Sequence, residues 1–492
     1  MLALLAHPLA PYATLSLFIV VMLVAVGALR DRNVAFAFTL LALGFLLVVN
    51  VPAVLGTGSA DVGDLLRVDG YAIFFMALFA GAGIVTTLLS GPYVTRLSPW
   101  PDEYYILLTT AVLGAVVTAA ANHFVSFLLG IEVLSISLYA MIAYPREGRK
   151  PLEAAAKYLV LSGAASSTML FGMALIYMAS GSLAFEPMTE LSANDNLIAD
   201  LGIAMLLVGI LFKLSLAPFH MWTPDVYQGA PAPVTAFLAT VSKGAVFAAF
   251  LRYATDSGIL ASDAIALGIG AVAVLSMVAG NVLALLQESV KRILAYSSIA
   301  HMGYLLIALV AAAGIGGNAA LGVETTLVYL TGYFVMTLAA FGVMTALSTD
   351  GQEADDLMAY EGLFWRRPVL AAVLTAAALS LAGIPLTVGF IAKFYVFAAG
   401  AEGTLWVLVW ALVIGSAIGI YYYLRIVFTM IRKPGEEPAE EGIEEPAPPA
   451  GGADATIPRL TAAVTIVLGL AILAFGIYPT PIIDFVTGLT GP

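Results

Sequence analysis

The chain of 492 residues is 61% hydrophobic and only 11% charged, a balance that excludes an ordinary soluble domain. It contains no cysteine, so disulfides, thiolate chemistry and iron–sulfur clusters held by this chain are excluded as well. The net charge of −12 comes largely from surface acid, including the run from Glu436 to Glu445, and we expect no nucleic-acid partner. The composition is that of a protein that crosses a lipid bilayer many times.

Apolar segments recur along the chain at the length of about 20 residues that a helix needs to cross a bilayer. Backbone groups in hydrocarbon must bond within a helix or around a closed barrel, whose strands would be only about ten alternating residues. The pattern predicts an all-α polytopic membrane protein with about 14 transmembrane helices. The predicted spans are 10–29, 34–55, 71–91, 104–121, 123–143, 152–179, 199–217, 233–252, 260–286, 291–313, 324–347, 369–399, 403–430 and 458–478.

The first apolar segment is too long for a signal sequence and lacks a small-residue cleavage site, so we expect a retained span. No Arg-rich transit peptide is recognisable, which favours a bacterial plasma (inner) membrane. Most basic residues outside the spans, from Arg30 to Arg459, fall on one side of the predicted membrane, and only Arg67 and Arg252 fall on the other. The positive-inside rule then predicts that both termini lie on the outer, periplasmic side.

The segment 433–455 is rich in Pro, Glu, Ala and Gly. Such a composition cannot bury enough apolar surface to fold. We expect a mobile cytoplasmic loop before the last span rather than a docking element, and we assign it no chemistry.

Ionisable residues lie inside five apolar segments, namely Glu132, Lys157, Lys213, Lys243 and Lys393. A charge in the middle of a membrane span costs at least about 2.5 kcal/mol, so its presence indicates pairing, hydration and function. One carboxylate and four amines, with no cluster of metal ligands beside them, predict a path for protons or cations. The alternative is that these charges only lock helices together by ion pairs.

Two apolar segments are interrupted close to a lysine. The stretch 212–234 reads FKLSLAPFHMWTPDVYQGAPAPV and contains four prolines, which remove backbone donors and clash with the preceding turn. The stretch 379–394 reads LSLAGIPLTVGFIAKF and places two glycines and a proline before Lys393. Broken helices in corresponding positions indicate paired repeats around an ion site, because unwound backbone is tolerated only beside protein or water. The alternative is that the prolines only kink helices for packing.

Lys243 lies about ten residues into its span and cannot easily extend to water. A nearby carboxylate stabilises a charged amine and burial opposes it, so a movement of Glu132 would change whether a lysine holds its proton. Lys157 is nearer a span end, and it could instead pair with Glu153.

Two histidines lie within or beside spans. His220 lies beside the first interruption, and His301 lies in AYSSIAHMGYLLIAL. Both could relay protons near neutral pH. The alternatives are that His220 caps the broken helix and that His301 is a hydrogen-bonded packing residue.

The chain resembles the antiporter-like membrane subunits of respiratory complex I, most closely subunit N of bacterial NADH:quinone oxidoreductase. Four stretches carry the resemblance: FKLSLAPFHMWTPDVYQGAPAPV, SKGAVFAAFLR, KRILAYSSIAHMGY and LAGIPLTVGFIAKFYVF. The resemblance covers essentially the whole chain, and it implies two inverted five-helix repeats with discontinuous helices 7 and 12. The implied domains are 1–103 with three helices, 104–252 with helices 4–8, 260–430 with helices 9–13, the loop 433–455, and 456–492 with the final helix.

The ionisable positions of the family match Glu132, Lys213, Lys243, Lys393, Lys157 and His301. The resemblance implies a switchable ion pair between Glu132 and Lys213, a central Lys243, and Lys393 at the outlet. A lysine at position 243 is typical of subunit N, whereas the larger sister subunits often carry histidine there.

The resemblance implies proton translocation that is driven by redox events in other subunits, with no cofactor in this chain. FMN, iron–sulfur clusters and quinone would belong to those partners. The implied partners are other membrane subunits of complex I, including a sister antiporter-like subunit and small membrane subunits, together with the lipid bilayer. The alternatives are a subunit of a multisubunit sodium/proton antiporter or of a membrane hydrogenase, and a membrane spacer whose charges only hold subunits together.

Overall fold

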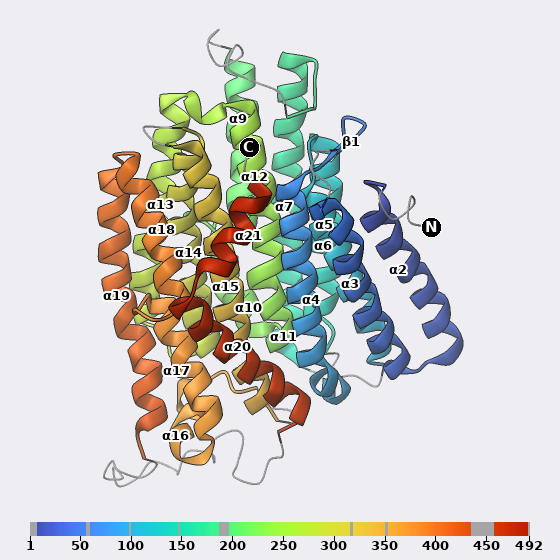
Figure 1. Cartoon of the computed structure of the whole chain (residues 1–492), viewed down its shortest axis with the longest axis vertical. Helices are drawn as coiled ribbons and strands as arrows, with labels where there is room; N and C mark the ends of the chain where they lie inside the picture. The colour runs from blue at the N-terminus through green and yellow to red at the C-terminus, as the bar shows by residue number, and fades with distance from the viewer. Residues whose placement is uncertain are drawn as a thin grey trace.

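The computed structural model describes residues 7–55, 60–97, 100–145, 148–185, 196–314, 318–349, 353–433 and 457–490. Most of its long helices lie side by side with their axes roughly aligned (Figure 1). The prediction of an all-helical membrane protein is confirmed for these residues. The loop predicted at 433–455 lies outside them from residue 434 onward.

The first part of the described chain contains three long helices and one small departure from the helical pattern. Between the second and third helices, two short strands pair antiparallel, with Asp61 opposite Arg67. This hairpin is a difference from the purely helical expectation, and it occupies a connection outside the spans. The elements are α2 (Ala10–Leu29), α3 (Arg32–Leu55), β1 (Ala60–Val62), β2 (Leu66–Val68) and α4 (Gly70–Leu97).

The next helices contain the first proline-rich stretch. Helix α7 packs on α9 and α10, and α5 packs on α6. The elements are α5 (Asp102–Ala119), α6 (Phe124–Ile142), α7 (Arg149–Ser180), α9 (Leu197–Lys213), α10 (Trp222–Gly229), α11 (Ala232–Phe237), a π-helical turn (Leu238–Ser242) and α12 (Lys243–Ser257).

The remaining helices contain the second interruption, which separates α17 from α18. Helix α13 packs on α14 and α19, and α15 packs on α18. The elements are α13 (Asp263–Leu285), α14 (Val290–Ala312), α15 (Ala319–Leu347), α16 (Leu363–Arg366), α17 (Pro368–Ala382), α18 (Val388–Glu402), α19 (Trp406–Ile431), α20 (Arg459–Ile477) and α21 (Thr480–Thr490).

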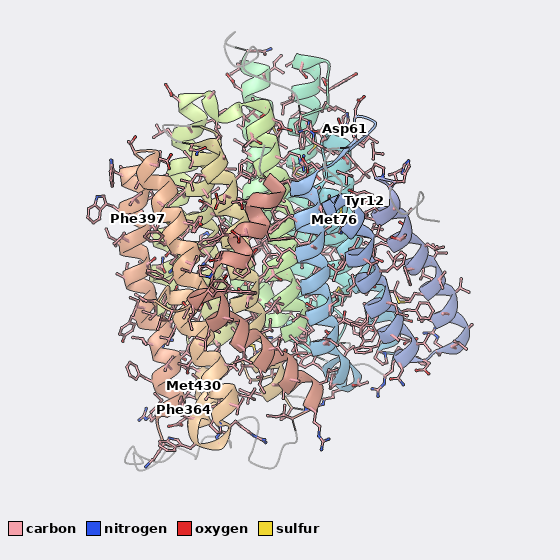
Figure 2. The ribbon with its side chains drawn as sticks, viewed as in Figure 1. Tyr12, Asp61, Met76, Phe364, Phe397 and Met430 are labelled. Atoms are coloured by element: carbon pink, nitrogen blue, oxygen red, sulfur yellow. The ribbon has the colours of Figure 1, made fainter. Side chains whose placement is uncertain are left out.

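Twelve helices of the described residues are long and apolar enough to cross a membrane. Two of them, 232–257 and α14, are buried along their whole apolar length, so they form the centre of the bundle. The outer helices expose apolar side chains, as Phe397 and Phe364 do near opposite ends of the bundle (Figure 2). A polar side chain on a central helix is therefore shielded from both lipid and bulk water.

Candidate functional site

Glu132 and Lys213 lie close together between α6 and α9. The Lys213 ammonium is 3.8 Å from Glu132 Oε1, and it donates hydrogen bonds to Ser135 at 2.8 Å and Ser162 at 2.7 Å. Ser166 donates to Glu132 at 2.5 Å. The side chain of Lys213 is only 3% exposed, whereas that of Glu132 is 32% exposed. The carboxylate of Glu132 is therefore partly exposed at the surface of the chain, whereas the amine of Lys213 is enclosed.

The interruption of the helix fixes the position of Lys213. It is the last residue of α9, and the backbone then turns through Ser215, whose φ is +63°. The indole of Trp222, at the start of α10, donates to the carbonyl of Phe212 at 3.1 Å. The end of a helix carries unpaired carbonyls and favours a cation, so the break itself provides a setting for the amine.

Lys243 lies at the centre of the bundle, directly after the π-helical turn. Its side chain donates to Ser298 Oγ on α14 at 2.7 Å and lies 5.5 Å from the ring centre of Tyr227. Tyr333 on α15 donates to the same serine oxygen at 2.7 Å. Single π-helical turns inside helices are frequent at functional sites, but no feature of the sequence indicated this one.

His301 lies one turn beyond Ser298 on α14. Its Nδ1 is 2.7 Å from Tyr329 OH, and its Nε2 is 3.3 Å from Tyr423 OH. The ring is buried, and Tyr423 also bonds Ser297. These contacts are those of a hydrogen-bonded histidine inside a polar network, so they leave both the relay and the packing interpretations open.

Lys393 folds back onto the second interruption. Its ammonium donates to the carbonyl of Ala382, the last residue of α17, at 3.0 Å and lies 5.2 Å from the ring centre of Tyr304. The chain leaves α17 at Gly383 with φ +86°, a conformation that favours glycine. Lys393 therefore contacts an unpaired helix-end carbonyl, as expected for a cation at a helix C-terminus.

The structure places the other two predicted site residues apart from this central group. Lys157 is 41% exposed and pairs with both Glu153 and Asp225 at 2.8 Å, and Asp225 also pairs with Arg292. Its contact with Glu153 is the pairing that the sequence left open as an alternative.

His220 lies in the turn between α9 and α10, with its ring 6.5 Å from that of Tyr296. The ring is buried, and within the described residues neither of its nitrogens has a hydrogen-bond partner of good geometry. The geometry does not show a helix cap at this position.

A second buried charge pair was missed by sequence reasoning. Lys291 at the start of α14 is fully buried, pairs with Glu353, and donates to the carbonyl of Ala230 at 2.7 Å. Glu353 also accepts from Tyr93 and from the backbone N–H of Ala232. Because Lys291 stands at the edge of an apolar segment, the sequence indicated only a basic residue in a connection.

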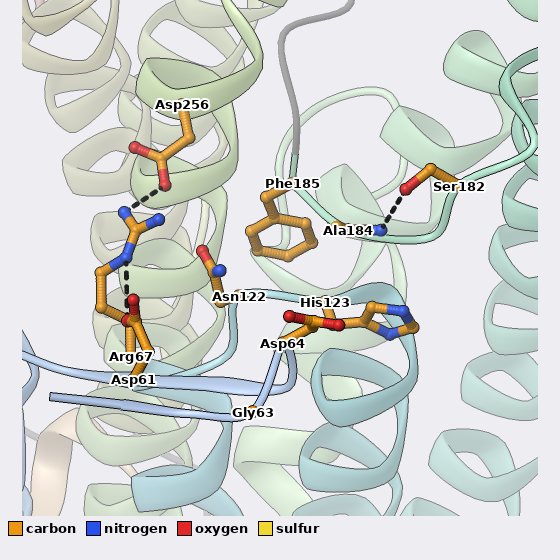
Figure 3. A pocket seen from close by; sticks show the side chains of 10 residues that line it. All are labelled: Asp61, Gly63, Asp64, Arg67, Asn122, His123, Ser182, Ala184, Phe185 and Asp256. Carbon is orange, nitrogen blue, oxygen red and sulfur yellow. Dashed lines mark hydrogen bonds and ion pairs between the residues drawn. The ribbon is translucent and has the colours of Figure 1, made fainter.

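A cavity lies elsewhere, at the end of the bundle that carries the β hairpin. Its volume is about 550 Å³, and Arg67 spans part of it to reach Asp256 and Asp61 (Figure 3). His123 lines the cavity at the start of α6, where burial lowers its pKa despite the nearby Asp64. None of the predicted site residues lines this cavity. Within the described residues no group of three or more His, Cys, Asp or Glu could hold a metal ion.

Buried amines, one partly exposed carboxylate and two helix interruptions are the features expected of a membrane module that moves protons or cations. The family described as "NADH:quinone oxidoreductase/Mrp antiporter, TM" matches residues 121–419. NADH-quinone oxidoreductase subunit N of Methylococcus capsulatus is 48% identical over 488 residues, which are 98% of this chain and 95% of that protein.

Two solved structures share the fold. A chain of respiratory complex I from Thermus thermophilus matches with a TM-score of 0.80 and 32% identity, over 96% of this chain and 98% of that one. A chain of the Mrp complex from Dietzia sp. matches with a TM-score of 0.82 but only 18% identity, over 98% and 97% of the two chains, so it shows the fold alone. The chain belongs to the family of subunit N, a membrane subunit of the bacterial proton-translocating NADH:quinone oxidoreductase, respiratory complex I.

Proposed function

We propose that this subunit translocates protons through Glu132, Lys213, Lys243, His301 and Lys393. The observation that carries the proposal is the placement of Lys213 and Lys243 almost wholly inside the bundle, against polar side chains, with one carboxylate beside the first. A charge buried only for packing would be replaced at little cost by a neutral group, whereas a transport path needs groups that gain and lose protons.

We propose that the path runs from the cytoplasm to the outside. Lys243 takes up a proton from the cytoplasm, and charge rearrangement from neighbouring subunits changes the distance between Glu132 and Lys213. The proton then passes by way of His301 to Lys393 for release outside. Moving one charge against 100 mV costs about 2.3 kcal/mol, and a two-unit change in a pKa corresponds to about 2.7 kcal/mol. A modest change in one buried pair is therefore large enough to drive the step.

Lys157 and His220 complete the proposed path. Lys157 lies at the partly exposed end of α7, where it could pass protons toward the interior, and His220 lies beside the break that follows Lys213. We assign them a smaller role than the central group, because within the described residues neither is hydrogen bonded to Lys213, Lys243 or Lys393.

The fold that we propose for this path has fourteen spans in two inverted repeats. The twelve uninterrupted candidates omit α9 with α10 and α17 with α18, which are too short when taken singly. Counting each pair as one discontinuous span, 7 and 12, gives fourteen. The region 1–103 then precedes the repeats 104–252 and 260–430, and 456–492 follows the loop 433–455.

An even count places both termini on the same side of the membrane, and we propose that this is the periplasmic side of a bacterial inner membrane. The end of the bundle with the β hairpin would face the periplasm, and the opposite end, where α16 lies, would face the cytoplasm (Figure 1). Arg366, the last residue of α16, agrees with the positive-inside rule.

We infer that the proposed partners cover the carboxylate of Glu132. The side chain is 32% exposed in the isolated chain, beside Leu129 and Ile136, which are exposed on the same face of α6. A carboxylate facing lipid would be costly, so a neighbouring membrane subunit, a sister antiporter-like subunit or a small one, is the expected cover. Iron–sulfur clusters would be held by other subunits, since this chain has no cysteine to ligate them. We propose that NADH, FMN and quinone also bind to other subunits.

The proposal is tested by NADH-driven proton uptake into inverted membrane vesicles. Native protein is compared with Lys213→Ala at matched abundance of the assembled complex. Loss of uptake with assembly intact supports the proposal, whereas unchanged uptake would reduce the buried charges to structural ion pairs. Sodium dependence without NADH would favour the antiporter alternative, which no observation on this chain favours at present.

A further inference from the structure

Two of the buried lysines share one hydrogen-bonding arrangement. Ser162 Oγ accepts from Lys213 at 2.7 Å and from Tyr139 at 2.8 Å. Ser298 Oγ accepts from Lys243 at 2.7 Å and from Tyr333 at 2.7 Å. The two serines lie on different helices, α7 and α14, and the two tyrosines on α6 and α15. The same three residue types therefore meet at two separate places. The surroundings differ, because Lys213 also donates to Ser135 at 2.8 Å and Ser298 Oγ also lies 3.5 Å from Tyr227 OH.

The hydroxyl group of serine has a property that this arrangement uses. It can accept two hydrogen bonds and donate one. With a charged lysine, both acceptor positions are filled, one by the ammonium and one by the tyrosine. With a neutral lysine, the lone pair of the amine needs a donor. The serine hydroxyl can turn its own hydrogen toward Nζ while still accepting from the tyrosine. One rotation of one O–H bond then serves both protonation states.

The third lysine lacks such a partner among the described residues. Lys393 donates to the carbonyl of Ala382, and a carbonyl oxygen can only accept. The neutral amine can still donate to this carbonyl, but the carbonyl offers no donor for the lone pair that the amine gains when its proton leaves. The difference separates two lysines whose neutral form finds a donor in a serine hydroxyl from one whose backbone contact provides none.

Resting on the proposed proton path, we propose that Lys213–Ser162–Tyr139 and Lys243–Ser298–Tyr333 are two switching units of the same composition. In each unit the serine is a positioning residue, which reverses the direction of its hydrogen bond as the lysine gains or loses its proton. The tyrosine holds the serine oxygen in place in both states. The hydroxyl thereby keeps a buried amine hydrogen bonded throughout the cycle, and an unpaired buried polar group is costly.

The experiment compares serine variants of the complete complex by NADH-driven proton uptake into inverted vesicles, at matched complex abundance. Ser298→Ala is expected to lower uptake about tenfold, the size expected for the loss of one hydrogen bond to a charged group. Ser162→Ala should lower uptake by less, because Ser135 still accepts from Lys213 at 2.8 Å. Ser298→Thr and Ser162→Thr keep the hydroxyl and should restore uptake. The matched control is Ser90→Ala, because Ser90 bonds Tyr104 at 2.9 Å in a buried pair without a lysine. It should pump as the native protein does.

Two further variants keep the test decisive if a threonine does not fit. Ser298→Cys preserves the size of the side chain but has a weak donor and a weak acceptor, so it should lose uptake as alanine does. Tyr333→Phe leaves the serine free to switch and should cost about twofold. Native uptake in Ser298→Cys, or an equal loss in Tyr333→Phe and Ser298→Ala, would overturn the serine as the switching group. Native uptake in Lys243→Ala would instead refute the proton path itself.

Discussion

The ammonium of Lys213 lies nearer to two serine hydroxyls than to its carboxylate partner. It is 2.7 Å from Ser162 Oγ and 2.8 Å from Ser135 Oγ, but 3.8 Å from Glu132 Oε1. The carboxylate instead accepts a short bond from Ser166. At 3.8 Å the two charges form a long ion pair, and a small movement of α6 would shorten or break it.

The loose pair makes Glu132→Gln a direct test of the charge. The amide keeps the size and the bond from Ser166 but removes the attraction for Lys213. We expect proton uptake per electron to fall about tenfold, the order of one charged hydrogen bond, while assembly stays normal. Uptake by inverted vesicles measures it. The control is Glu103→Gln, in which an exposed carboxylate is changed; an equal loss there would contradict a specific role for Glu132.

Lys157 is expected to be less important than Lys213. Its ammonium is shared between Glu153 and Asp225 in a partly exposed cluster, where ion pairs contribute about 0–1 kcal/mol to stability. Lys157→Ala should leave the complex stable and lower proton uptake by less than Lys213→Ala does. Both are measured in one vesicle preparation series. A loss as large as that of Lys213→Ala would move Lys157 into the central path.

The two buried histidines differ in their hydrogen bonds. His301 contacts the hydroxyls of Tyr329 and Tyr423, whereas within the described residues His220 has no well-aligned partner. His301→Gln should therefore lower uptake more than His220→Gln, by about tenfold against about twofold. The ratio of the two losses, measured at equal complex abundance, is the readout. Equal losses would contradict a special place for the network around His301.

The sequence predicted the charged positions and the interruptions because each has a strong local signal. A lysine inside twenty apolar residues, or four prolines in one stretch, can be recognised without a structure. The contact of Ser162 with Lys213 could not be predicted, because it depends on how α7 packs against α9. A contact between distant helices has no local pattern.

The Lys291 pair was missed for the same reason. Its partner Glu353 follows α15, and 62 residues of sequence separate the two. A basic residue at the edge of a span usually extends to water, and the sequence offers no sign that a connection folds over this one. The positions of charges could thus be predicted, whereas their partners could not.

An ion pair at the periplasmic end of the proposed orientation should be sensitive to acid. Asp69 accepts two bonds of 2.8 Å from Arg252, whose side chain is 4% exposed. Burial acts to raise the pKa of Asp69, but the bonds from Arg252, its charge and the N–H of Ala72 outweigh burial, so the pKa lies below its ordinary value. Its ionised form therefore stabilises the fold above the unfolded pKa of about 3.9.

Asp69→Asn should destabilise the subunit at neutral pH by about 3 kcal/mol, because it leaves a buried guanidinium unpaired. The difference from the native protein should be constant between about pH 5 and 8 and should shrink as the pH falls through the native pKa of Asp69. Thermal melting of the purified complex at a series of pH values measures it. Asp61→Asn, at an exposed position, is the control. A difference that grows on acidification would have the wrong sign for this pair.

Gly383 carries no charged group, but its backbone conformation positions Lys393. It has φ +86°, and a Cβ there would lie 2.8 Å from Lys393 Cδ. Gly383→Ala would strain the backbone by about 1–2 kcal/mol and push the lysine away from the carbonyl of Ala382. We expect Gly383→Ala to lower proton uptake, although every ionisable residue is kept and the complex assembles normally. Gly268→Ala is the matched control, since a Cβ in that helix meets nothing within 4 Å; it should pump normally. Normal uptake in Gly383→Ala would mean that Lys393 does not need its contact with the helix end, and that the lysine reaches its proton acceptor from more than one position.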